Sequence, residues 1–128
     1  MLKITPTDNE LEEQGAWGEY RGVKLLIARG NNIKFKREFK RLSAPHSRAI
    51  SKGRLDEQTA NDIVVRSAAV GLLRGWKNFI VDGEEVEFNV QNAIDLLRSD
   101  PDCLDYVQEF ADDVDNYIVN EMDEIGKE

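Results

Sequence analysis

The sequence predicts a mainly α-helical protein, a compact helical domain of four to five helices with a small N-terminal β-hairpin. Three observations support this fold class. Apolar residues recur at helical spacing in residues 33–42 and 101–125, and residues 57–76 are apolar around most of a helix. Only residues 16–28 show two short apolar runs with a turn signal between them. The 128 residues fit one domain, which we place at residues 15–128 behind a flexible acidic leader, residues 1–14.

The hairpin is predicted from the runs Ala16–Tyr20 and Val23–Ala28. Gly22 lies between the two runs and can adopt the positive φ that a tight turn needs. Because an isolated two-stranded hairpin is only marginally stable in water, it must pack against the rest of the chain. We expect Trp17 to pack in the core, with contact to a partner protein as the alternative.

A basic amphipathic helix follows the hairpin, from Ile33 to Leu42. Asn31 or Asn32 offers its N-cap, and Pro45 ends it because proline disfavours helix in the residue before it. One face is apolar and the remaining positions are mostly basic. The apolar residues are Phe35, Phe39 and Leu42, and the basic ones are Lys34, Lys36, Arg37, Lys40 and Arg41.

The next helix is predicted over residues 57–76, with Asp56 as its N-cap. Its wide apolar arc makes it the expected hub of the fold. Residues 76–86, which include Trp76 and Phe79, form a connector with a turn signal at Asp82-Gly83.

Two further helices complete the predicted domain. Asn89 can cap a short helix over residues 90–98, and Asp100 precedes a helix that begins at Pro101 and runs to about residue 125. The outer face of this last helix is acidic, and the acids near its start are favoured by the helix dipole.

The net charge of −8 is unevenly distributed along the chain. Residues 21–54 carry a net charge of +10 and residues 82–128 a net charge of −14. Such asymmetry points either to charged partners or to solvated helix faces whose opposite charges attract each other within one fold. The basic part could meet phosphate, an acidic protein, or the acidic end of this same protein. Nucleic-acid binding through residues 33–54 is the alternative function, although the acidic half and the lack of a helix-turn-helix recognition helix argue against it.

We expect no enzymatic activity, no cofactor and no metal site. His46 is the only histidine and has no triad partners in the sequence pattern, and one cysteine with one histidine cannot supply a zinc site. Residues 112–115 resemble a calcium-loop fragment but lack its glycine and terminal glutamate. Cys103 has no cysteine to pair with, and no signal peptide or membrane span is evident, so we expect a cytoplasmic protein.

Several segments, in order, resemble the tail assembly chaperones of long-tailed bacteriophages. The resemblance covers roughly residues 15–128. It is carried by Gly15-Ala16-Trp17, Leu26-Ile27-Ala28-Arg29-Gly30-Asn31-Asn32, Phe35-Lys36-Arg37-Glu38-Phe39-Lys40-Arg41-Leu42, Gly75-Trp76-Lys77-Asn78-Phe79, Asp82-Gly83-Glu84, Phe88-Asn89 with the helix after it, and the acidic residues 102–128.

This resemblance implies a mainly helical, non-enzymatic protein. Members of the family bind the tape measure protein, help recruit tail tube subunits, and tend to be absent from the finished tail. Some are also made in a longer frameshifted form, and Gly126-Lys127 could be encoded by a slippery stretch. The family has no diagnostic binding residue, so candidate site residues come from the physical pattern alone.

We therefore predict a tail assembly chaperone. The alternatives are a small nucleic-acid-associated phage protein that uses residues 33–54, and a structural tail component that stays in the particle. Opposite charges in the two halves also favour head-to-tail self-association, with residues 33–54 meeting residues 100–124 of a neighbour. The candidate partner-binding residues are Trp17, Lys34, Phe35, Lys36, Arg37, Phe39, Lys40, Arg41, Trp76, Phe79, Asp105, Glu109, Asp112 and Asp113.

Overall fold

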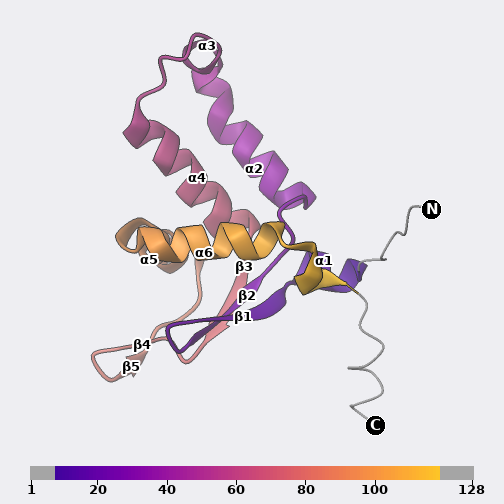
Figure 1. The fold of residues 1–128 in the computed structure, drawn as a ribbon. Coiled ribbons are helices and arrows are strands. Elements are labelled where there is room, and N and C mark those ends of the chain that lie inside the picture. The colour runs from indigo at the N-terminus through magenta and orange to yellow at the C-terminus, as the bar shows by residue number, and fades with distance from the viewer. Residues whose placement is uncertain (1–7, 119–128) are drawn as a thin grey trace, which may run out of the picture.

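A computed structural model describes residues 8–118, in which groups of helices and groups of strands follow one another along the chain (Figure 1). The α-helices are α1 (Asn9–Gln14), α2 (Ile33–Ser43), α3 (Ser47–Ser51), α4 (Glu57–Gly71), α5 (Val90–Ser99) and α6 (Pro101–Asp112). Two 3-10 helices are η1 (Ala44–His46) and η2 (Val114–Tyr117). The strands are β1 (Ala16–Tyr20), β2 (Val23–Ile27), β3 (Leu73–Lys77), β4 (Ile80–Val81) and β5 (Glu84–Glu85).

The prediction of a mainly α-helical fold is wrong, because the described chain is a mixed α/β protein. The N-terminal hairpin is part of a three-stranded antiparallel sheet of order β1-β2-β3, and β4 and β5 form a second, two-stranded sheet. In the larger sheet Leu26 pairs with Trp17 on one side and with Gly75 on the other.

The strand β3, which the sequence did not predict, overlaps the end of the predicted helix 57–76. In the structure the helix ends at Gly71, and residues 73–77 form β3 instead. A Cβ atom added to Gly71 would lie 2.3 Å from Cα of Phe35, so the end of α4 packs directly against the backbone of α2. Gly75 also disfavours helix, and residues 73–77 gain backbone hydrogen bonds by pairing with β2. The predicted connector 76–86 contains the end of β3, β4, β5 and the turn at Asp82-Gly83.

The predicted helix 101–125 is also shorter than expected within the described residues. α6 ends at Asp112, and the side chain of Asp113 then accepts a hydrogen bond from the backbone of Asp115 at 3.0 Å, as the N-cap of η2. The extended backbone of Asp113 ends α6, and its side chain starts the next helical turn. Residues 119–125 of the prediction lie outside the described part.

Within the predicted leader 1–14, residues 9–14 form α1, and residues 1–7 lie outside the described part. Asp8 caps α1 by accepting from the backbone of Glu10 at 2.9 Å and of Leu11 at 3.3 Å. The backbone N–H of Asp8 also donates to the carbonyl of Tyr117 at 2.6 Å. The start and the end of the described chain therefore meet beside the sheet (Figure 1).

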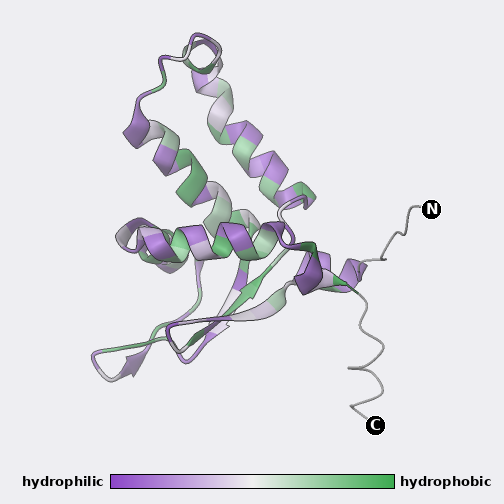
Figure 2. Ribbon diagram, in the orientation of Figure 1, coloured by the Kyte–Doolittle hydropathy of each residue, from purple (hydrophilic) through white to green (hydrophobic). Residues whose placement is uncertain are grey.

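The core lies between the sheet and the helices α4, α5 and α6. Leu25 and Ile27 of β2 are fully buried, as are Val65, Leu97 and Val107 from these three helices, with at most 1% exposure. Figure 2 shows the same layering, with apolar colouring along β2 and the lower half of α4.

The second feature of the fold is a projecting arm. α2 and α4 rise side by side from the body, and η1 and α3 connect them at the far end (Figure 1). We call α2, η1, α3 and α4 the arm, and η1 with α3 its tip. None of the helices within residues 8–118 has the length and apolar character that a membrane crossing requires.

Candidate functional site

The base of the arm is fixed by one buried side chain, Asn32, which is only 3% exposed. Its carbonyl oxygen accepts from the backbone of Phe35 at 2.9 Å, as the N-cap of α2. Its amide nitrogen donates to the carbonyl of Arg29 at 2.5 Å and to that of Gly71 at 3.0 Å. One side chain thus joins the start of α2 to the end of α4 and to the loop after β2, because each helix end leaves backbone groups that need partners.

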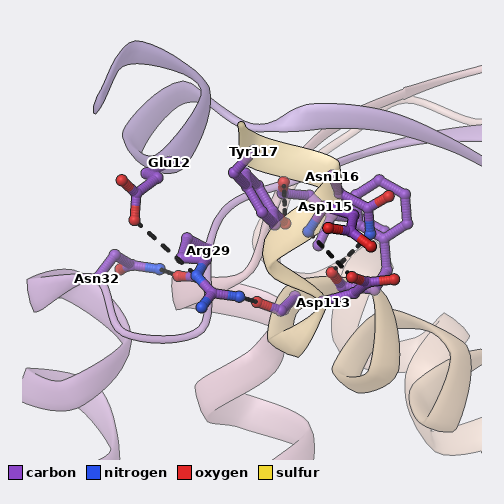
Figure 3. A network of polar contacts seen from close by, with 10 residues as sticks. Glu12, Arg29, Asn32, Asp113, Asp115, Asn116 and Tyr117 are labelled. Atoms are coloured by element: carbon purple, nitrogen blue, oxygen red, sulfur yellow. Dashed lines mark hydrogen bonds and ion pairs between the residues drawn. The ribbon is translucent and has the colours of Figure 1, made fainter. Parts of the chain in front are cut away.

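Arg29 extends this junction towards the chain's C-terminal side (Figure 3). Its guanidinium donates to the carbonyl of Ala111 at 3.2 Å, forms an ion pair with Glu12 at 3.9 Å, and lies 5.7 Å from the ring centre of Tyr117. The hydroxyl of the fully buried Tyr117 donates to the carbonyl of Ile27 at 2.9 Å. Burial raises the pKa of Tyr117 well above its usual range, so the hydroxyl remains a donor at neutral pH. These contacts tie the base of the arm rigidly to the sheet, α1 and α6.

The tip of the arm carries an apolar groove of about 550 Å³. Phe39 and Ile50 are 42% and 45% exposed, and both line this groove, so it gathers two exposed large apolar side chains from different helices. The ring of Phe39 stacks on that of Phe35 at 6.2 Å, which holds it in place along α2. The groove is lined by Phe39, Lys40, Ser43, Ala44, Ser47, Ile50 and Ser51.

One basic side chain, Lys40, lines this groove, and the segment that forms the groove is strongly basic. Residues 33–54 contain eight lysines and arginines and one acid, a net charge of +7, which leaves −15 for the rest of the chain. All eight bases are exposed. Among residues 8–118, only Arg41 of these eight forms an ion pair, with Glu38 on the same helix. The predicted residues Lys34, Phe35, Lys36, Arg37, Phe39, Lys40 and Arg41 therefore all lie on α2, with Phe35 facing α4 and the others wholly or partly in solvent.

The expectation that Trp17 packs in the core is wrong, because it lies on a different surface, the open face of the sheet. It is 46% exposed, and the ammonium of Lys77 lies 4.6 Å from the centre of its ring. Trp76 and Phe79 pack against other residues of the protein and so have a structural role. Trp76 donates its ring N–H to the carbonyl of Val86 at 2.8 Å, and the rings of Phe79 and Phe88 each lie 4.9 Å from it, edge to face. This aromatic cluster fastens β4 and β5 to the main sheet.

The predicted acidic residues lie away from the arm's tip. Asp105 and Glu109 are exposed on α6, one helical turn apart. Asp112 lies against Gly30, and Asp113 caps η2. The structure thus separates the predicted partner-binding residues into a basic arm, an aromatic sheet face and an acidic helix.

Sequence reasoning missed the tip residues Ala44 and Ile50, and the exposed bases Arg48, Lys52 and Arg54 were grouped only as part of a basic segment. The available signal was Ile50, an apolar residue isolated among bases and serines after Pro45. It could not be interpreted without knowing that α3 turns back beside the end of α2.

The described residues offer little for chemistry. No three His, Cys, Asp or Glu side chains among residues 8–118 are grouped so that they could hold a metal ion. Cys103 is fully buried, and burial raises the pKa of its thiol to about 12, so it is protonated at neutral pH.

Comparison with known proteins identifies the origin of the chain. A family model described as YdaY prophage protein matches residues 30–128, which include the arm, β3 to β5, α5 and α6. Searches of curated proteins and of solved structures give no match. The matched region is more than three quarters of the chain, and this phage-derived protein therefore belongs to the YdaY prophage protein family.

Proposed function

We propose that this prophage protein is a tail assembly chaperone, which binds the tape measure protein and helps recruit tail tube subunits in the host cytoplasm. Membership of a prophage family supports a phage role, and the ordered resemblance of residues 15–128 to tail assembly chaperones supports this particular role. The protein acts by binding rather than by catalysis.

The observation that carries the proposal is the groove at the arm's tip. Two large apolar side chains, Phe39 and Ile50, are nearly half exposed there, on an element that projects from the body (Figure 1). Leaving such side chains in water is unfavourable, and burying the remaining exposed surface of each would contribute about 1 kcal/mol to binding. Binding of a partner protein over the groove would bury this surface and be stabilised by that free energy. Such binding is expected of a chaperone that covers part of its partner during assembly.

Co-purification with the tape measure protein of the same prophage tests the proposal. We expect retention at about 0.15 M salt, and loss of retention when Phe39 and Ile50 are both replaced by serine. The matched control replaces Ile80 and Val81 by serine, since these are 61% and 49% exposed but lie on β4, away from the arm. Failure of the unaltered protein to retain the tape measure protein would refute the chaperone role.

One observation favours a second candidate, a nucleic-acid-associated phage protein: seven exposed bases of residues 33–54 make no ion pair within residues 8–118. Duplex DNA used as a parallel bait tests it. Retention on DNA alone, falling steeply with salt, would support this candidate over the chaperone. A structural tail component is separated from both by finding the protein in purified particles.

The charge distribution also supports self-association, with residues 33–54 of one copy against the acidic residues 100–124 of the next. Asp105 and Glu109 are exposed on α6 and available for such contact, and residues 119–124 lie outside the described part. Sedimentation velocity at low and high salt tests this arrangement. We expect a larger species at low salt, and an unchanged sedimentation coefficient would rule it out.

A further inference from the structure

We infer that the groove at the arm's tip receives an acidic amphipathic helix of the partner protein. This inference rests on the proposed protein-binding role and adds the chemistry of the bound segment. It depends on three features of the tip: its shape, its apolar lining and the charges around it.

The shape of the groove fits one helix face. Its walls come from the last turns of α2 and from α3, and η1 closes the end between them. Between the apolar side chains lie small residues, Ala44 and the serines at 43, 47 and 51. Small side chains lower the floor of a groove, so that the larger side chains of a facing helix can enter it as ridges enter grooves in helix packing.

The side chains that line the groove favour a partner helix with an apolar stripe. Phe39 and Ile50 supply the exposed apolar surface, and the hydroxyl of Ser51 already donates to the carbonyl of Arg48 at 3.0 Å. Covering the remaining exposed surface of either side chain corresponds to roughly a fivefold to tenfold gain in affinity.

The positive charges at the tip favour a partner helix that carries Glu or Asp beside that stripe. Lys40 lines the groove, and Arg48 lies on α3, with Lys52 and Arg54 immediately after it. All four side chains lack an ion-pair partner within residues 8–118. A partner helix with Glu or Asp beside its apolar stripe would neutralise them at contact distance, where screening by salt is weakest.

The remainder of the molecule argues against a polyanion as the occupant. Outside residues 33–54 the chain carries −15, so an extended duplex or an anionic membrane approaching the tip would be repelled wherever it reached beyond this basic segment. A single short helix contacts the tip alone and avoids this repulsion.

Synthetic peptides test the inference without the tape measure protein. Two designed helical peptides of about 20 residues have the same leucine stripe. The polar face of the acidic striped peptide is mostly glutamate, and that of the basic peptide is mostly lysine. A third peptide keeps the acidic composition in scrambled order, which removes the stripe. Binding to the full chain is followed by fluorescence anisotropy, and the contact surface by backbone amide chemical shifts.

We expect the acidic striped peptide to bind at least about tenfold more tightly than the other two, with shifts confined to residues 39–54. Phe39→Ala and Lys40→Glu should each weaken it about fivefold or more, whereas Val81→Ala, an exposed apolar site on β4, should not. Circular dichroism of each variant checks that the fold is kept.

Equal binding of the basic peptide, or shifts that map outside the arm, would overturn the inference. So would displacement of the acidic peptide from the same residues by a short DNA duplex or by phosphatidylserine vesicles with equal or higher affinity. Because the peptides are independent of the tape measure protein, a negative result here combined with successful co-purification would reject the acidic-helix inference and leave the chaperone role standing.

Discussion

Replacing Asn32 by alanine should lower the free energy of unfolding by about 3 kcal/mol. The substitution removes the N-cap of α2, which contributes about 1 kcal/mol, and two further hydrogen bonds of about 1 kcal/mol each. Their carbonyl acceptors, on Arg29 and Gly71, lose a partner at a site where Asn32 is only 3% exposed. The expected loss is therefore a large part of the stability of a small domain.

Urea unfolding followed by tryptophan fluorescence and far-ultraviolet circular dichroism measures this loss. With a slope of about 1.5 kcal/mol per molar urea, the midpoint should fall by about 2 M. The midpoint of Asn32→Ser should lie between those of the unaltered protein and Asn32→Ala. A serine hydroxyl can cap the helix, but it cannot replace both hydrogen bonds that the Asn32 amide donates. The matched control is Asn31→Ala at the adjacent exposed position, which should stay within about 0.5 kcal/mol of the unaltered protein. If Asn32→Ala lost no more stability than Asn31→Ala, the reasoning about the arm's base would be refuted.

Three other perturbations probe the fold. Gly71→Ala should destabilise by about 2 kcal/mol in the same urea assay, because the new Cβ would lie 2.3 Å from the backbone of Phe35 and α2 must move; equal or higher stability would contradict this close approach. Cys103, whose pKa burial raises from 9.0 to about 12, should resist a thiol reagent at about pH 8 until the protein unfolds. Its contribution to stability should fall as the pH rises from about 9 towards 12, and the pH dependence of stability should be flatter in Cys103→Ala; rapid labelling of the native thiol would be inconsistent with its burial. Asp62→Asn should cost about 0.5 kcal/mol at neutral pH, since this carboxylate, about two-fifths exposed, accepts from Arg66 at 2.9 Å and pairs with Arg98 at 2.5 Å. Burial raises the pKa of Asp62, but the hydrogen bonds from the two arginines outweigh it and leave the pKa lowered. The difference between variant and parent should therefore begin to shrink as the pH falls below about 4 and disappear below the lowered pKa; a difference independent of pH in the acid range would contradict the ion-pair origin.

Local patterns in the sequence predicted those elements whose determinants are close along the chain. The turn at Arg21-Gly22 joins strands at the predicted residues, and the N-caps Asp56 and Asn89 start α4 and α5 where expected. For α2 the sequence left Asn31 and Asn32 open, and the structure selects Asn32. Each of these features depends on residues no more than a few positions apart.

The fold class was wrong because its deciding contact is distant in sequence. β3 forms because Gly75 pairs with Leu26. The sequence of residues 57–76 alone does not indicate that this segment pairs with the distant strand β2. Leu72, Leu73 and Trp76 suit a helix face and a strand equally well, so the apolar pattern extended the predicted helix past Gly71.

The candidate site was likewise predicted only in part. The charge and spacing of residues 33–42 identified α2 as an exposed basic helix carrying Phe39. The groove needed the turn at η1 to bring Ile50 beside Phe39, and such a tertiary juxtaposition has no periodic signal. Trp76 and Phe79 illustrate the opposite error, because aromatic residues in a predicted connector resembled binding residues until their cluster with Phe88 was visible.

The hydrogen bond from Asp8 to Tyr117 has a practical consequence for experiments on the living phage. It brings both ends of the described chain to one pole of the molecule, while the tip of the arm projects elsewhere (Figure 1). A fluorescent protein or affinity tag joined directly before Asp8 or directly after Ile118 would start from that same pole and leave the groove open. Tags at these two positions should therefore be interchangeable.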